Sequence, residues 1–241
     1  MTHPSSPASL AGRSPHRRAA LGTALIAATL TLASCAAAPN HVQQESAANI
    51  LKSAAKALSS ARSFAIQATS TAQGSAGSLT FDIQGANQGE GAFTSASVSF
   101  QAEELKGIDY FRSKTLWSQV GGASLQSALG DRWVYIAAKS STAAQLTLAF
   151  GELTSPKELA LGLRKSASDA VRGKLTTFQG QPVIAVNEPP HAALYIATTG
   201  KPYPLRWVQT PSTQVDFSDF GKQFHLTAPK KPLDLAAILS G

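Results

Sequence analysis

Residues 63–84 read SFAIQATSTAQGSAGSLTFDIQ. Apolar side chains take alternate positions in its two halves, first at Phe64, Ile66 and Ala68, then at Leu79, Phe81 and Ile83. Polar residues fill most of the positions between them, and Gly74 and Gly77 separate the halves. A period of two is typical of a strand that buries one face. The stretch therefore predicts two antiparallel strands joined by a turn.

The same alternation recurs along the chain. After a Gly-rich connection at 85–91, a third strand is predicted around Ala96, Val98 and Phe100, followed by a strand pair at 105–112 and a strand at 133–136. Six further strands are predicted at 171–175, 183–186, 193–198, 205–209, 215–217 and 224–226. About ten or eleven antiparallel strands make a sheet of the size that curls into a half-barrel.

Helical spacing interrupts this pattern in a few places. Residues 45–62 carry one apolar stripe, and residues 142–166 predict a helix pair or a helix kinked near Pro156. A single helical turn is predicted at 123–129 and a short helix at 233–239. Trp117 and Trp133 flank the helical turn at 123–129. Each is expected either to cover the hydrophobic core or to stack on a ligand. The fold class is therefore α+β, a strongly curved antiparallel sheet with helices covering its concave face.

The N-terminal residues have the pattern of an export signal. Arg13, Arg17 and Arg18 precede the uncharged stretch 19–32, which is too short to span a bilayer. The sequence Leu-Ala-Ser-Cys at 32–35 resembles the lipobox of bacterial lipoproteins, which implies transfer of a diacylglyceryl group to Cys35 and cleavage before it. An ordinary secretory signal with an incidental cysteine is the alternative. We expect a signal peptide at 1–34, a lipidated tether at 35–44 and one domain at 45–241, anchored to the outer face of the cytoplasmic membrane.

Composition and motifs narrow the function classes. Cys35 is the only cysteine, so no intramolecular disulfide can form. The formal charge of +7 falls to about +4 without the three arginines of the leader, which is too small to predict nucleic-acid binding. His41, His191 and His225 lie too far apart for a metal site, and no nucleophile elbow or phosphate-binding loop occurs. The acid pair Glu103-Glu104 is expected on a solvated edge, its side chains facing opposite ways. We expect no enzyme, no metal and no cofactor.

A family resemblance rests on several segments taken together. They are the lipobox at Cys35, the helix leading into 63–66, the hairpin 107–112, the segment 130–134, and the closing strands with 193–196, 200–202, 204–207 and 215–222. This pattern resembles the mycobacterial lipid-carrier lipoproteins of the LppX and LprG type, whose half-barrel fold is shared with the lipoprotein carrier LolA. The resemblance implies a hydrophobic cavity between sheet and helices that accommodates the acyl chains of lipids, lipoglycans or lipoproteins. It implies no catalytic or metal residues.

Two functions of different class follow. In the first, a monomeric carrier binds a lipid, glycolipid or acylated protein in a cavity of several hundred Å³. Its predicted lining is apolar throughout: Phe64, Ile66, Leu79, Phe81, Ile83, Val98 and Phe100 on the sheet, with a roof of Leu146, Phe150, Leu159 and Leu163. In the second, the domain is an anchored interaction or sensor module whose concavity is filled by its own side chains.

Overall fold

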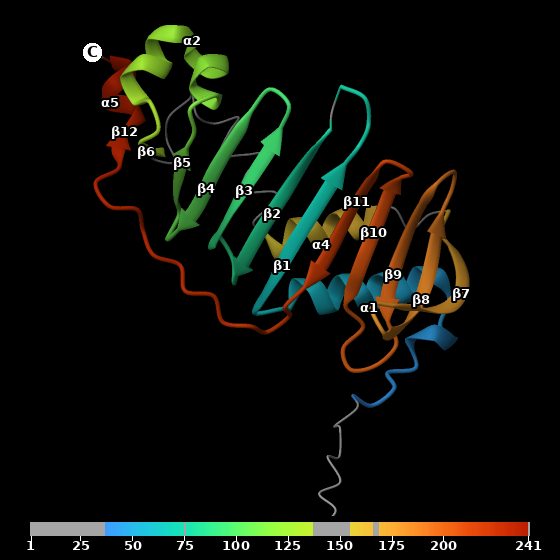
Figure 1. Ribbon diagram of the computed structural model, residues 1–241. Helices are drawn as coiled ribbons and strands as arrows, with labels where there is room; N and C mark the ends of the chain where they lie inside the picture. Colours follow the sequence, from blue (N-terminus) through green and yellow to red (C-terminus); the bar gives the residue numbers. More distant parts are fainter. Residues whose placement is uncertain (1–36, 75, 137–154, 166–168, 241) are drawn as a thin grey trace, which may run out of the picture. The chain divides into compact units, whose positions relative to one another are not determined.

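Twelve strands form one open sheet in the part of the chain that the computed structural model describes, residues 37–74, 76–136, 155–165 and 169–240 (Figure 1). The strands are β1 (Ser63–Ser70), β2 (Gly77–Gln84), β3 (Gly89–Ser95), β4 (Ser99–Leu105), β5 (Ile108–Arg112), β6 (Trp133–Ile136), β7 (Val171–Phe178), β8 (Gln181–Glu188), β9 (Ala192–Ala197), β10 (Pro204–Thr210), β11 (Thr213–Ser218) and β12 (Leu233–Asp234). Their order across the sheet is β12-β6-β5-β4-β3-β2-β1-β11-β10-β9-β8-β7. All neighbours pair antiparallel except β12 with β6. The predicted antiparallel half-barrel is confirmed, and it does not close into a barrel.

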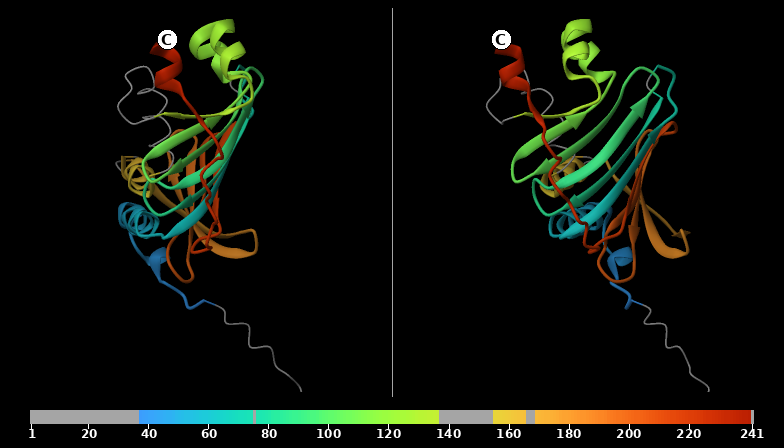
Figure 2. Two further views of the ribbon diagram at one scale, coloured as in Figure 1. Left: turned by 90° about the vertical axis from the view of Figure 1, so that its left-hand side faces the viewer. Right: turned by 60° about the vertical axis from the view of Figure 1, so that its left-hand side comes forward.

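Helices α1 (Ala47–Ser59) and α4 (Pro156–Lys165) lie side by side on one face of this sheet, which we call the inner face (Figures 1 and 2). The side chain of Ser46 begins α1 by accepting a hydrogen bond from the N–H of Asn49. Apolar residues at three- and four-residue spacing then fall on one side of the helix, where Ile50, Leu51, Ala54 and Leu58 are completely buried. This face packs against β8 and β10, and α1 also contacts α4. The predicted helix at 45–62 is confirmed.

The other helices lie near β5 and β6. Helix α2 (Leu116–Leu129) is longer than the predicted single turn, and Gly121 and Gly122 break it with non-helical backbone angles. Trp117 of α2 is fully buried in the core. Helix α5 (Leu235–Ser240) contacts β6, and a short 3₁₀ turn, η1 (Val42–Gln44), precedes α1. Among the described residues, no helix is both long enough and apolar enough to cross a membrane.

The predicted third strand is wrong. Residues 96–98 form the turn between β3 and β4, where the N–H of Ser95 donates to the carbonyl of Val98, and Ser99 and Phe100 begin β4. The true strand β3 begins at Gly89, inside the stretch interpreted as a Gly-rich connection. Its glycines belong to a strand because the ring of Phe81 lies over Gly89 and Gly91 and occupies the space of their missing side chains.

The predicted strand at 224–226 is also wrong. These residues have no regular secondary structure, and the N–H of Phe224 donates to Oε1 of Gln84 at 2.7 Å. The chain from Asp219 to Pro232 runs along one end of the strands from β11 to β6, where Leu233 and Asp234 add β12 (Figure 1). The sheet has twelve strands, where about ten or eleven were predicted.

The contact of Phe81 with Gly91 gives a stability prediction. A Cβ atom at Gly91 would collide with the Phe81 ring and the carbonyl oxygen of Thr80. We expect Gly91→Ala to lower the free energy of unfolding by about 1–3 kcal/mol, as overpacking does. Gly162→Ala on α4 is the control, because its Cβ meets no atom within 4 Å and alanine favours a helix by about 1 kcal/mol. Urea denaturation measures both; equal stability of Gly91→Ala and wild type would contradict the packing described.

Candidate functional site

A row of apolar side chains crosses six neighbouring strands on the inner face. Residues that are directly opposite in antiparallel strands share a face. From β10 to β4, the residues that are aligned in this way are Trp207, Val215, Ala68, Leu79, Phe93 and Phe100. We call these six residues the inner apolar row. All six are half-buried rather than fully buried. Five strand spacings of about 4.8 Å make the row about 24 Å long.

The adjacent positions on the same face are packed as core. Ile66, Phe81, Ala102, Phe111 and Phe217 occupy the next aligned row, and each is at most 4% exposed. Toward β8 the inner apolar row continues into Leu194 and Val186, which are completely buried beneath the region that α1 contacts. The line of apolar residues is thus completely buried on β8 and β9 and half-buried from β10 to β4.

The row is apolar apart from one donor. The Nε1 atom of Trp207 is buried and has no hydrogen-bond partner among the residues that the structure describes. An indole N–H in an apolar site is available to an ester or carboxyl oxygen. Two aromatic rings at the other end, Phe93 and Phe100, lie with their centroids 5.3 Å apart. The row therefore combines a long apolar surface with a single polar group near one end.

A groove between α1 and α4 carries positive charge. Its walls bear the exposed cations Lys52 and Lys56 from α1 and Lys157 and Arg164 from α4, around a floor that includes Ala55, Ala160 and Leu161. The groove has a volume of about 420 Å³. The ion pairs of the described residues, Arg112–Asp131, Arg206–Asp216 and Lys222–Asp219, include none of these four cations. Such a groove attracts an anionic group and also offers it an apolar surface.

The structure brings most of the predicted lining residues together. Phe64, Ile66, Phe81, Ile83 and Leu163 are buried in one hydrophobic cluster, and Leu79, Val98, Phe100 and Leu159 pack against it. Leu146, Phe150 and Cys35 lie outside the described residues. That these side chains line a ligand cavity stays a prediction.

Sequence reasoning missed part of the row. Phe93 follows directly on the stretch 85–91, which was interpreted as a Gly-rich connection, so it was not assigned to a strand. Trp207 and Val215 lie more than a hundred residues farther along the chain than Leu79. The signal that identifies Val215 was its alternation with Gln214 and Asp216, which marks a strand but not its neighbour. Pairing of β1 with β11 brings these positions together.

The acid pair Glu103-Glu104 is not on a solvated edge as predicted. The two side chains do face opposite ways, but β4 lies inside the sheet, and Glu103 and Glu104 are only 4% and 6% exposed. Among the described residues, no group of three or more His, Cys, Asp or Glu side chains is arranged to hold a metal ion.

Comparison with known proteins gives a likeness of fold. No family model matches the chain, and neither does any curated protein sequence. The crystal structure of LprF from Mycobacterium bovis matches with a TM-score of 0.50 and 13% sequence identity, covering 76% of this chain and 96% of that one. Mycobacterium tuberculosis lipoprotein LppX matches with a TM-score of 0.48 and 13% identity, covering 75% and 98%. The LprF match confirms that the described residues have the open half-barrel fold that the sequence resemblance implied.

Proposed function

We propose that this protein binds the acyl chain of a lipid or acylated molecule along the inner apolar row and carries or presents it at the cell envelope. The observation that carries the proposal is the alignment of six half-buried apolar side chains across six strands. Covering such a surface with a hydrocarbon chain yields about 25 cal/mol for each Å² removed from water. The length of the row, about 24 Å, suits a long-chain acyl group.

The likeness to LprF and the sequence pattern support the same function. LprF from Mycobacterium bovis has an open half-barrel fold like that of this chain. The lipobox sequence ending at Cys35 supports lipid attachment and anchoring to the outer face of the cytoplasmic membrane. The tether at 35–44 would place the domain near the bilayer, where a cargo lipid can be exchanged.

Titration of the purified full-length protein with a fluorescent long-chain fatty acid tests the proposal. We expect saturable binding at one site, with displacement by unlabelled phospholipid. The fluorophore of the bound probe should also quench Trp207 by energy transfer, so the variant Trp207→Phe should bind the probe with less quenching of tryptophan fluorescence. Absence of binding at concentrations below the critical micelle concentration would contradict the proposal.

The basic groove between α1 and α4 gives a second prediction. We expect this surface to approach the anionic headgroups of a donor or acceptor membrane, where each basic residue contributes about 1 kcal/mol. The double variant Lys52→Gln, Lys56→Gln should therefore bind vesicles rich in phosphatidylglycerol about 30-fold more weakly, because 1.4 kcal/mol is a factor of ten.

Co-sedimentation with vesicles measures this effect. The matched control is Lys114→Gln, Lys174→Gln, which removes two exposed lysines outside the groove and should change vesicle binding much less. Vesicles of phosphatidylcholine alone should show no difference between the variants. Equal losses in the two double variants would show that net charge, not the groove, determines binding.

A further inference from the structure

Three carboxylates lie next to one another on the outer face of the sheet, opposite to the face that bears α1 and α4. The pairing aligns Asp82 of β2 with Glu90 of β3, and Glu90 with Glu103 of β4. Directly opposed side chains have their Cβ atoms about 5 Å apart, and like charges at such positions are destabilising. When they are ionised, three acids in register therefore lower the stability of the folded sheet, so we looked for a role of these side chains in binding.

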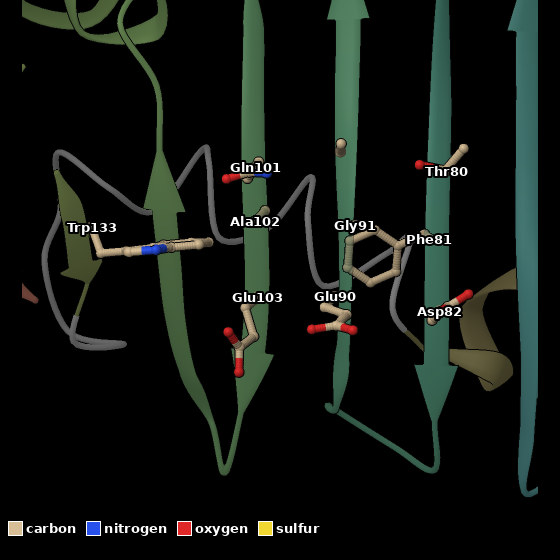
Figure 3. A pocket seen from close by; sticks show the side chains of 10 residues that line it. Thr80, Phe81, Asp82, Glu90, Gly91, Gln101, Ala102, Glu103 and Trp133 are labelled. Carbon is tan, nitrogen blue, oxygen red and sulfur yellow. The ribbon is translucent and has the colours of Figure 1, made fainter. Parts of the chain in front are cut away.

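These carboxylates line a pocket of about 330 Å³ (Figure 3). Thr80, Gln101 and Trp133 are among the other residues that line it, and the indole of Trp133 extends across β5 toward β4. The carboxylates of Glu90 and Glu103 lie beside each other on the neighbouring strands β3 and β4 (Figure 3). An aromatic face next to clustered anions is the combination that recognises organic cations.

Glu103 is the member of this group that points to a ligand. It is 4% exposed, and its Oε1 accepts no hydrogen bond from any described residue. Burial, followed by the charge of Glu90, raises the pKa of Glu103 to about 7. Burial also raises the pKa of Glu90 and of Asp82. The described cation that most influences Asp82 is Lys222, and its Nζ forms an ion pair with Asp219 at 3.2 Å.

We propose that this outer-face pocket binds an organic cation, an alkylammonium or guanidinium group. Its N–H groups donate to the unpaired Oε1 of Glu103 and to Glu90, Asp82 adds negative charge, and the Trp133 ring lies against the hydrocarbon next to the cationic nitrogen. The carboxylates do not form a metal-ligand cluster, which favours a larger cation with several directed donors. Because the pocket is on the other face from the inner apolar row, the proposal does not depend on lipid binding.

Such a cation has two sources, a free amine or a basic side chain of a partner protein. Isothermal titration of the purified full-length protein at pH 8 with spermidine, and separately with a trilysine peptide, distinguishes them. Tighter binding of spermidine indicates a small-molecule site, and tighter binding of trilysine indicates a site for a basic segment of a protein. Failure of both probes to bind at millimolar concentration would overturn the proposal.

The variant Glu103→Gln tests the site itself. It removes the buried charge but keeps the shape, so it should fold with at least wild-type stability and bind the better probe at least about tenfold more weakly. Glu158→Gln on α4, an exposed position away from the pocket, is the matched control and should bind like wild type. Undiminished binding by a folded Glu103→Gln protein would overturn the proposal.

Acidification provides an independent readout. On one side, Glu103 faces Glu90 and, one strand farther, Asp82; on the other side it faces Tyr110. Lys222 and Asp219, in the segment that follows β11, act on Asp82. Because protonation of Glu103 near pH 7 removes the acceptor charge, affinity for the probe should fall severalfold between pH 8 and pH 6. In Glu103→Gln this pH dependence should be much weaker, and an unchanged profile would count against the assignment.

Discussion

Replacing Phe93 by aspartate is expected to lower the affinity for a long-chain fatty acid by at least about a hundredfold. Phe93 lies near one end of the inner apolar row, between Leu79 and Phe100. A carboxylate at this position would have to be desolvated beneath the acyl chain without a partner, which costs several kcal/mol. Each 1.4 kcal/mol is a factor of ten in affinity. Fluorescent fatty-acid titration measures the loss.

The neighbouring residue gives the matched control. Thr94 follows Phe93 on β3, so its side chain faces the outer side of the sheet, where it is exposed. Thr94→Asp therefore adds the same charge to the same strand without placing it in the row. It should leave fatty-acid affinity within about twofold of wild type. Equal losses in Phe93→Asp and Thr94→Asp, with both proteins folded, would show that the acyl chain does not lie on the inner face.

The second large effect is on stability and depends on pH. Burial and neighbouring carboxylates raise the pKa of Glu103 and that of Asp109 to about 7 each, from ordinary values near 4.5 and 3.8. Glu90 is the neighbour for Glu103, and Glu104 is the neighbour for Asp109. The folded protein therefore holds protons that the unfolded chain releases at lower pH. The part of the folding stability that comes from protonation of these two carboxyls is fully present below about pH 4, and it is lost as the pH rises through about 7.

Thermal unfolding at pH 5 and pH 8 measures this dependence. The melting temperature should be several degrees higher at pH 5, since each kcal/mol moves Tm by about 2–4 °C in a domain of this size. The double variant Glu103→Gln, Asp109→Asn should melt at nearly the same temperature at both pH values and above wild type at pH 8. Asp169→Asn, an exposed position, is the control. A wild-type protein that is more stable at pH 8 than at pH 5 would contradict the burial of these carboxyls.

Local patterns predicted the elements that have a clear period. The stripe from Ala47 to Leu58 gave helix α1, and the alternation from Phe64 to Ile83 gave β1 and β2. Strand β3 was missed because glycines read as a turn, although Gly89 and Gly91 are required beneath the Phe81 ring. The requirement comes from a residue on another strand, so it is invisible in a local window.

The candidate sites depend on pairing between distant segments. Alternation alone identified Leu79 and Phe100 as inward-facing, but only the pairing of β1 with β11 and of β11 with β10 adds Val215 and Trp207 to the same row. In the same way, Asp82, Glu90 and Glu103 each look like an ordinary polar strand position. Their alignment follows from the register of three strands, and a shift of one residue would turn them to different faces.

Native mass spectrometry of the full-length protein, purified from its producing cells and from a Cys35→Ser strain, decides whether the protein carries a lipid. Extraction of the Cys35→Ser protein with organic solvent separates a bound cargo from any acyl group attached to Cys35. We expect one non-covalently bound lipid or acylated molecule per chain, which Phe93→Asp loses and Thr94→Asp retains. A protein that emerges empty, and that refuses fatty acids and phospholipids offered in excess, would contradict lipid carriage and indicate an interaction domain whose concavity is filled by its own side chains.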